Sequence, residues 1–201
     1  MKISIQEGDE SDDIHVDIDH LLHHTRLPHT AFSVSADNFV RRVGETISWV
    51  WIVLLAVIIL NVTVRYVFDQ GRIEFEEIQW HLYAMGFLVA LSYCFEADSH
   101  VRVDIFHERM TLRNQAWVEM GGILFLLLPF ISMVIYFAVP FVAYSWVVSE
   151  ASDAPSGLPA RWAIKSFMVT GFILLGLATL SRLTRVASLL FGFPKEISVS
   201  D

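Results

Sequence analysis

Residues 47–65 read ISWVWIVLLAVIILNVTVR, and this run decides the fold of the chain. It holds twelve Ile, Leu or Val residues, which at roughly −0.3 to −0.6 kcal/mol each supply about −4 to −7 kcal/mol of apparent insertion free energy. Arg65 stands at its end, where a long side chain reaches the lipid headgroups at little cost. We therefore predict a membrane-spanning helix from about Glu45 to Phe68.

Three more apolar segments follow, over about residues 74–95, 117–148 and 162–183. The second is weak, because its seven strongly apolar residues supply only roughly −2 to −4 kcal/mol. Polar side chains fill its first two turns, namely Glu76, Glu77, Gln79 and His81. We expect this helix to pack against protein rather than to face lipid on all sides.

The third segment is longer than a bilayer requires. Its apolar stretch of 26 residues, 123–148, would measure about 39 Å as a helix, against a hydrocarbon core of about 30 Å. The helix must therefore tilt, kink or extend beyond the bilayer, and Pro129 and Pro140 offer kink sites. The four segments together predict an all-α integral membrane protein with four transmembrane helices.

The composition agrees with a membrane protein. Hydrophobic residues make up 54% of the 201 positions and charged residues 18%, whereas soluble domains carry about a quarter charged residues. The single cysteine, Cys94, excludes an intrachain disulfide and a thiol-based zinc site. Because Cys94 lies in an apolar run, we interpret it as a small packing residue.

Acidic residues concentrate at the N-terminus, where residues 1–40 carry a net charge of −6 out of −8 for the whole chain. Low hydrophobicity and high charge predict a disordered tail over 1–38. A four-helix membrane domain over 39–188 and a C-terminal tail over 189–201 follow. The irregular spacing of the tail histidines favours a hydrated tail over a divalent-metal site. These histidines are His15, His20, His23, His24 and His29.

Lys and Arg residues indicate the orientation. The N-terminal tail, the 96–116 connection and the C-terminus carry ten of them, and the two other connections carry four, which puts both termini in the cytoplasm. Within 98–116, Val103, Phe106 and Met110 recur at helical spacing. We therefore predict a short amphipathic cytoplasmic helix between the second and third spans. The alternative is a polar loop.

Three carboxylates, Glu74, Glu76 and Glu77, open the second span. A helix N-terminus favours negative charge, so a capped and solvated helix end is one interpretation. The other is a polar contact with a partner subunit, or an ion pair with Arg65 or Arg72. Side chains four residues apart share a helix face, and at similar depth they would form one polar cluster. Its members would be Asn61, Arg65, Glu76, Glu77 and His81.

The spans show no catalytic machinery. A haem of the b type needs two His ligands on facing helices, yet His81 is the one histidine inside a predicted span. A proton relay needs ionisable groups at successive depths, and the middles of the first, third and fourth spans hold none. We therefore expect neither an enzyme nor an autonomous pump, and no cofactor or metal in this chain.

Four short motifs stand in order along the body of the chain. They are Arg65-Tyr66-Val67-Phe68, Glu76-Glu77, His100-Val101-Arg102-Val103-Asp104 and Gly157-Leu158-Pro159-Ala160-Arg161-Trp162. Together with four spans and this topology, they resemble the small membrane subunit of tripartite ATP-independent periplasmic (TRAP) transporters, the DctQ-like family, over about residues 39–185. The cytoplasmic loop motif would comprise His100, Arg102 and Asp104. The outer loop motif would comprise Gly157, Pro159 and Trp162.

The resemblance implies a subunit of a secondary transporter in the bacterial inner membrane. Such a subunit joins a large multispanning permease, which holds the substrate and sodium sites. A periplasmic substrate-binding protein delivers the solute, typically a carboxylate-bearing compound. The small subunit broadens the static scaffold against which the large one moves as an elevator. The expected partners are these two proteins and the lipid bilayer, with no nucleic acid.

Two other interpretations remain open. The chain is a structural membrane anchor or assembly subunit of a respiratory or redox complex, or it is a self-contained channel formed by homo-oligomers. Co-purification of a large multispanning partner favours the transporter subunit, whereas a haem protein or flavoprotein favours the anchor. Sodium-dependent uptake by the chain without a partner favours the channel.

Overall fold

The computed structural model of the chain describes residues 28–97 and 111–194. These residues form α2 (Ala31–Val67), α3 (Ile73–Glu96), α5 (Leu112–Gly122), the π-helical turn η1 (Ile123–Leu127), α6 (Leu128–Val147) and α7 (Arg161–Phe191). No strand occurs within the two described ranges. Four segments are long and apolar enough to cross a membrane, namely α2, α3, Arg113–Val147 and α7. The prediction of an all-α membrane protein with four spanning helices is confirmed.

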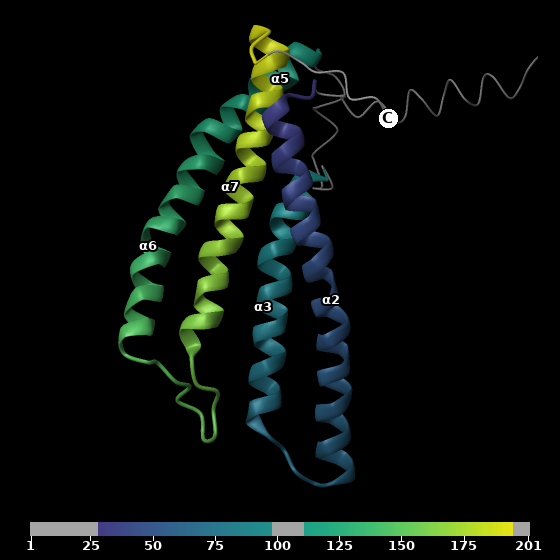
Figure 1. Cartoon of the computed structure of the whole chain (residues 1–201), viewed down its shortest axis with the longest axis vertical. Helices are drawn as coiled ribbons and strands as arrows, with labels where there is room; N and C mark the ends of the chain where they lie inside the picture. The colour runs from purple at the N-terminus through teal and green to yellow at the C-terminus, as the bar shows by residue number, and fades with distance from the viewer. Residues whose placement is uncertain (1–27, 98–110, 195–201) are drawn as a thin grey trace, which may run out of the picture.

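The four spans run along the long axis of the molecule, with α7 and α3 between α6 and α2 (Figure 1). α7 contacts α2, α3 and α6, whereas α6 packs on α7 and η1. The loops 68–72 and 148–160 lie together at one end of the bundle, called the loop end below. The start of α2 and the end of α7 lie at the opposite end, called the terminal end.

α2 begins at Ala31, well before the predicted start near Glu45. The Thr30 hydroxyl accepts from the Ser33 N–H at 3.2 Å, and the Ser33 hydroxyl accepts from the Thr30 N–H at 3.0 Å. This reciprocal capping box starts the helix. Ser33 and Val40 are buried, so the early turns pack against protein. The turns before residue 39, expected in the N-terminal tail, therefore belong to α2. Hydropathy does not detect these turns, because contacts with protein stabilise them.

The third predicted span is one helical unit, Arg113–Val147, which η1 interrupts. In η1 the Leu128 N–H donates to the Ile123 carbonyl, five residues before it. Pro129 follows directly; it has no N–H and its ring crowds the carbonyl four residues earlier, which a wider turn relieves. The break in the helical pattern therefore lies next to one of the two predicted kink sites, and Pro140 lies inside α6.

α7 runs to Phe191, beyond its predicted end near residue 183. Gly192 ends the helix in the left-handed conformation, with φ of 67°, and its N–H donates to the Ser188 carbonyl at 2.9 Å. Glycine is the usual residue at this position because it has no Cβ to clash. Residues 189–191, expected in the C-terminal tail, therefore belong to α7.

The connection between α3 and α5 carries two further predictions. Residues 98–110 lie outside the described part of the chain, and most of the predicted amphipathic helix lies there. The loop motif of His100, Arg102 and Asp104 lies there too. α5 begins at Leu112, so the end of the predicted segment is helical. The amphipathic helix and the role of the motif stay predictions.

Candidate functional site: polar anchors at the two ends of the bundle

Glu77 of α3 anchors the loop 148–160 to the bundle. This residue is 6% exposed, and its Oε2 accepts a hydrogen bond from the Leu158 N–H at 2.6 Å. The other carboxylate oxygen, Oε1, accepts from the Ser152 hydroxyl. The Ser152 N–H donates in turn to the Leu158 carbonyl at 3.1 Å, so the two anchor points are joined within the loop. Two charge-assisted hydrogen bonds from one loop to one buried carboxylate hold that loop in place.

The outer loop motif predicted from the sequence lies in and beside this anchor. A Cβ at Gly157 would lie 2.3 Å from the Ser152 Cβ, so glycine is required for the loop to close. Pro159 is exposed at the surface of the loop. Trp162, in the first turn of α7, packs edge-on against Trp146 of α6, with ring centroids 4.3 Å apart. Gly157 and Trp162 therefore shape the connection between α6 and α7.

An ion pair closes the base of the same loop. Glu150, which follows α6, pairs with Lys165 of α7. The Lys165 ammonium also lies 3.9 Å from the centroid of the Phe141 ring, in cation–π geometry. The Arg161 N–H donates to the Glu150 carbonyl at 3.0 Å. The hydrogen bond from Lys165 lowers the pKa of the Glu150 carboxyl below its ordinary value.

Acid should therefore loosen the base of the loop. Because the folded loop lowers the pKa of Glu150, the ionised carboxylate stabilises the loop at pH values above the ordinary pKa of 4.5. This stabilisation is lost as the pH falls through the lowered pKa of the folded state. An environment-sensitive dye attached through Asp153→Cys should report a loop transition below that ordinary value. Glu150→Gln is the control, because it removes the titrating group. An identical acid transition in that variant would contradict the prediction.

The predicted polar cluster divides between two neighbours. Arg65 Nη1 lies 3.7 Å from Glu76 Oε1, and both side chains are well exposed. Glu77 instead points at the 148–160 loop. The His81 Nδ1–H donates to the Glu77 carbonyl at 2.5 Å, within α3 itself. Asn61 is half-buried on α2 and takes no part in these contacts. The structure thus joins Arg65 to Glu76, and Glu77 to the loop, but does not gather all five residues.

Charged contacts join sequence-distant helices at the terminal end. Asp37 of α2 accepts from the Ser181 hydroxyl of α7 at 2.5 Å and lies 3.7 Å from Arg185 Nη1. Arg182 of α7 is 8% exposed, and its Nε donates to Glu119 of α5 at 2.5 Å. These contacts fix one end of α7 to α2 and α5 together.

Asp37, Glu119 and Arg182 were not among the residues expected to carry function. The sequence does hold a signal for two of them, because Arg182 closes the last apolar run and Glu119 stands at the start of the third, at similar expected depth. Opposite charges at one depth near a membrane surface favour pairing. Ser152 has no such signal, since its contact with Glu77 depends on the path of the loop.

A metal site has no support within residues 28–97 and 111–194, where no three His, Cys, Asp or Glu side chains are grouped to hold an ion. Of the tail histidines, all but His29 lie outside these ranges. The described contacts of Glu77, Glu150 and Arg182 join helices to loops and to one another.

The sequence matches a family model described as tripartite ATP-independent periplasmic transporters, DctQ component, over residues 54–189. This range covers more than half of the chain. It includes both sides of the loop anchor, Glu77 and Leu158, and the buried pair of Glu119 and Arg182, but it leaves out Asp37. No curated protein matches the sequence.

Proposed function

The chain belongs to the DctQ component family of tripartite ATP-independent periplasmic transporters, and we propose that it is the small permease subunit on whose scaffold the large permease works. The large subunit would hold the substrate and sodium sites, and a periplasmic binding protein would deliver a carboxylate-bearing solute. This chain would bind no cofactor and catalyse no reaction. The family match over residues 54–189 carries the proposal.

The proposed orientation places the loop end in the periplasm and the terminal end in the cytoplasm, within a bacterial inner membrane. The excess of Lys and Arg on the side of both termini supports it. In this orientation the loop 148–160, held by Glu77, lies on the side from which a binding protein would arrive. Ser156 and Pro159 are exposed on it.

We assign the contact with the large permease to α3. Trp80, Tyr83 and Phe87 are 68%, 56% and 49% exposed, and their spacing puts them on one face of the helix. Glu76 pairs with Arg65 near the headgroups, and Tyr83 lies seven residues further along α3, so about 10 Å into a hydrocarbon core of about 30 Å. Its hydroxyl has no hydrogen-bond partner among the described residues. An unpaired hydroxyl at that depth is costly in lipid, which favours a protein partner with an acceptor.

The outward face of α2 has the opposite character. Its exposed side chains Ile52, Leu55 and Ile59 are aliphatic. The Thr63 hydroxyl, also exposed, donates to the Ile59 carbonyl of its own helix at 2.8 Å. Because no polar group of this set needs an outside partner, the face suits acyl chains, and we assign it to lipid.

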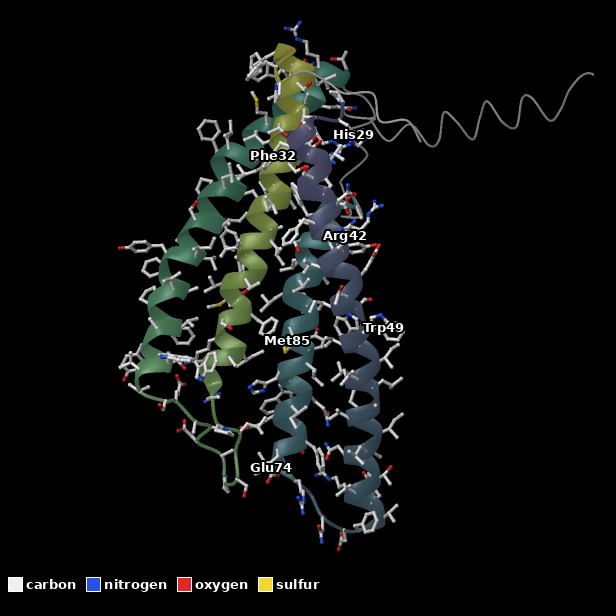
Figure 2. The ribbon with its side chains drawn as sticks, viewed as in Figure 1. His29, Phe32, Arg42, Trp49, Glu74 and Met85 are labelled. Carbon is white, nitrogen blue, oxygen red and sulfur yellow. The ribbon has the colours of Figure 1, made fainter. Side chains whose placement is uncertain are left out.

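Truncating Trp80 tests the assignment of α3. We expect Trp80→Ala to lower the amount of large permease that co-purifies with the chain by about tenfold or more, since tryptophans buried at protein interfaces are often energetic hot spots. Trp49→Ala is the matched control, because Trp49 is 67% exposed and points away from α3 on the outside of α2 (Figure 2). Equal loss in both variants would move the permease contact away from α3.

Reconstitution tests the function itself. Proteoliposomes that hold this chain alone should show no sodium-dependent uptake, whereas those with the large permease, supplied with the binding protein, should show it. Uptake by the chain alone would overturn the scaffold role. Recovery of a haem protein or flavoprotein in place of a large permease would overturn it as well.

A further inference from the structure

A cavity of about 240 Å³ lies between α2 and α3, in the part of the bundle nearer the terminal end. Two glycine–aromatic contacts bound it. A Cβ at Gly44 would lie 2.7 Å from the Tyr93 ring, and one at Gly86 would lie 3.0 Å from the Trp51 ring. The volume is below the roughly 300–1,000 Å³ of pockets for compact ligands. The cavity has room for part of one extended hydrocarbon chain.

The lining of the cavity changes from polar to apolar along α2. Glu45 and Ser48 line it and are exposed, and Trp51 lines it one turn further on. Glu45 and Arg65 are separated by about 30 Å along the helix, which is the thickness of the hydrocarbon core. With Arg65 at the headgroups of one leaflet, Glu45 lies at the headgroups of the other. The cavity then extends about 9 Å from there into the acyl chains.

Charged side chains of both signs surround the polar end. Arg41 and Arg42 lie one helical turn before Glu45, beyond the hydrocarbon core. Arg42 is exposed, but it lies seven residues before Trp49 and so on the face of α2 that points away from α3. Arg41 lies 3.5 Å from Glu96, yet its side chain remains 57% exposed. One guanidinium group, that of Arg41, and two carboxylates, those of Glu45 and Glu96, thus lie near the point where the cavity meets the headgroups.

We propose that this cavity binds one phospholipid with an ethanolamine headgroup from the leaflet on the side of the termini. The Arg41 guanidinium, which remains largely exposed beside Glu96, binds its phosphate, as arginines do for phosphate oxygens. The Glu45 carboxylate binds its ammonium, a group that a phosphatidylglycerol headgroup does not carry. One acyl chain occupies the cavity against Trp51. The site does not depend on the transporter role, because it lies within this chain.

Filling the cavity tests the acyl-chain part. We expect native mass spectrometry of the purified full-length chain to show one retained phospholipid, and Ala90→Phe to lower its occupancy at least about fivefold, because Ala90 lines the cavity and a larger side chain excludes the acyl chain. Ala56→Phe is the matched control, since Ala56 is exposed on α2 outside the lining. Equal retention in both folded variants would overturn the site, whatever the permease experiments show.

Changing the headgroup partner tests selectivity. From an equal mixture of phosphatidylethanolamine and phosphatidylglycerol, the wild-type chain should retain the former in about tenfold excess, the effect of a charge-assisted hydrogen bond. Glu45→Gln should remove this preference, whereas Asp69→Asn, in the loop at the other end, should keep it. Retention of phosphatidylglycerol with equal or greater preference by the wild type would overturn the ethanolamine assignment.

Discussion

Glu77→Ala should release the loop 148–160 from α3 and lower the free energy of unfolding by about 2–4 kcal/mol, because two donors lose a charged acceptor in a buried place. The Leu158 N–H and the Ser152 hydroxyl are those donors. Unfolding of the purified chain by a denaturing detergent measures the free energy. Labelling of Asp153→Cys by a water-soluble maleimide should speed up in the same variant.

Glu76→Ala is the matched control for this prediction, since it removes the neighbouring carboxylate of the same helix turn. Its pair with Arg65 is long, at 3.7 Å, and well exposed, so the loss should stay within about 0.5 kcal/mol. Glu77→Gln should fall between the two, because it keeps the shape and an acceptor but not the charge. Equal losses for Glu76→Ala and Glu77→Ala would contradict the anchor.

Arg182→Ala should destabilise the terminal end by about 3–5 kcal/mol, the range for removing one partner of a buried ion pair. Its Nε donates to Glu119 Oε1 at 2.5 Å, and Arg182 is 8% exposed. Removing the guanidinium leaves the Glu119 carboxylate without that partner among packed helices. The expected readout is a lower midpoint of thermal unfolding and a lower yield of folded chain.

A second variant separates charge from packing at this site. Arg182→Met combined with Glu119→Leu should recover most of the stability, because apolar residues of similar volume often replace a buried ion pair without loss. Arg113→Ala, at an exposed position of α5, should change the stability by less than about 0.5 kcal/mol. Loss in the double variant equal to that of Arg182→Ala would contradict the ion-pair explanation.

Much of the fold follows from the sequence. Helices α2, α3 and α7 lie where apolar runs predict them, and the third run forms one helical unit with its break beside Pro129. The errors fall at helix ends. α2 starts early because Thr30 and Ser33 cap a polar turn, and α7 ends late because Gly192 stops it, both beyond the apolar runs.

The candidate site follows from the sequence in part. Glu77 and Gly157 each stand out, one as a carboxylate in a weak span and the other in a loop motif. The connection between these two residues cannot be read from the sequence. Gly157 acts by letting Ser152 approach closely, and Ser152 then binds Glu77. The side chains of neighbouring Glu76 and Glu77 meet different partners, because successive residues of a helix point about 100° apart.

The sequence by itself determined that residues 47–65 and three later runs cross a membrane, because insertion free energy is a sum over the residues of one segment and needs no knowledge of its neighbours. It also determined that the second span is too polar to face lipid on all sides. The tertiary structure decided which partner each polar side chain has. Hydrogen bonds and ion pairs act over a few ångströms, so the meeting of Glu77 with Leu158, or of Arg182 with Glu119, depends on how the helices pack.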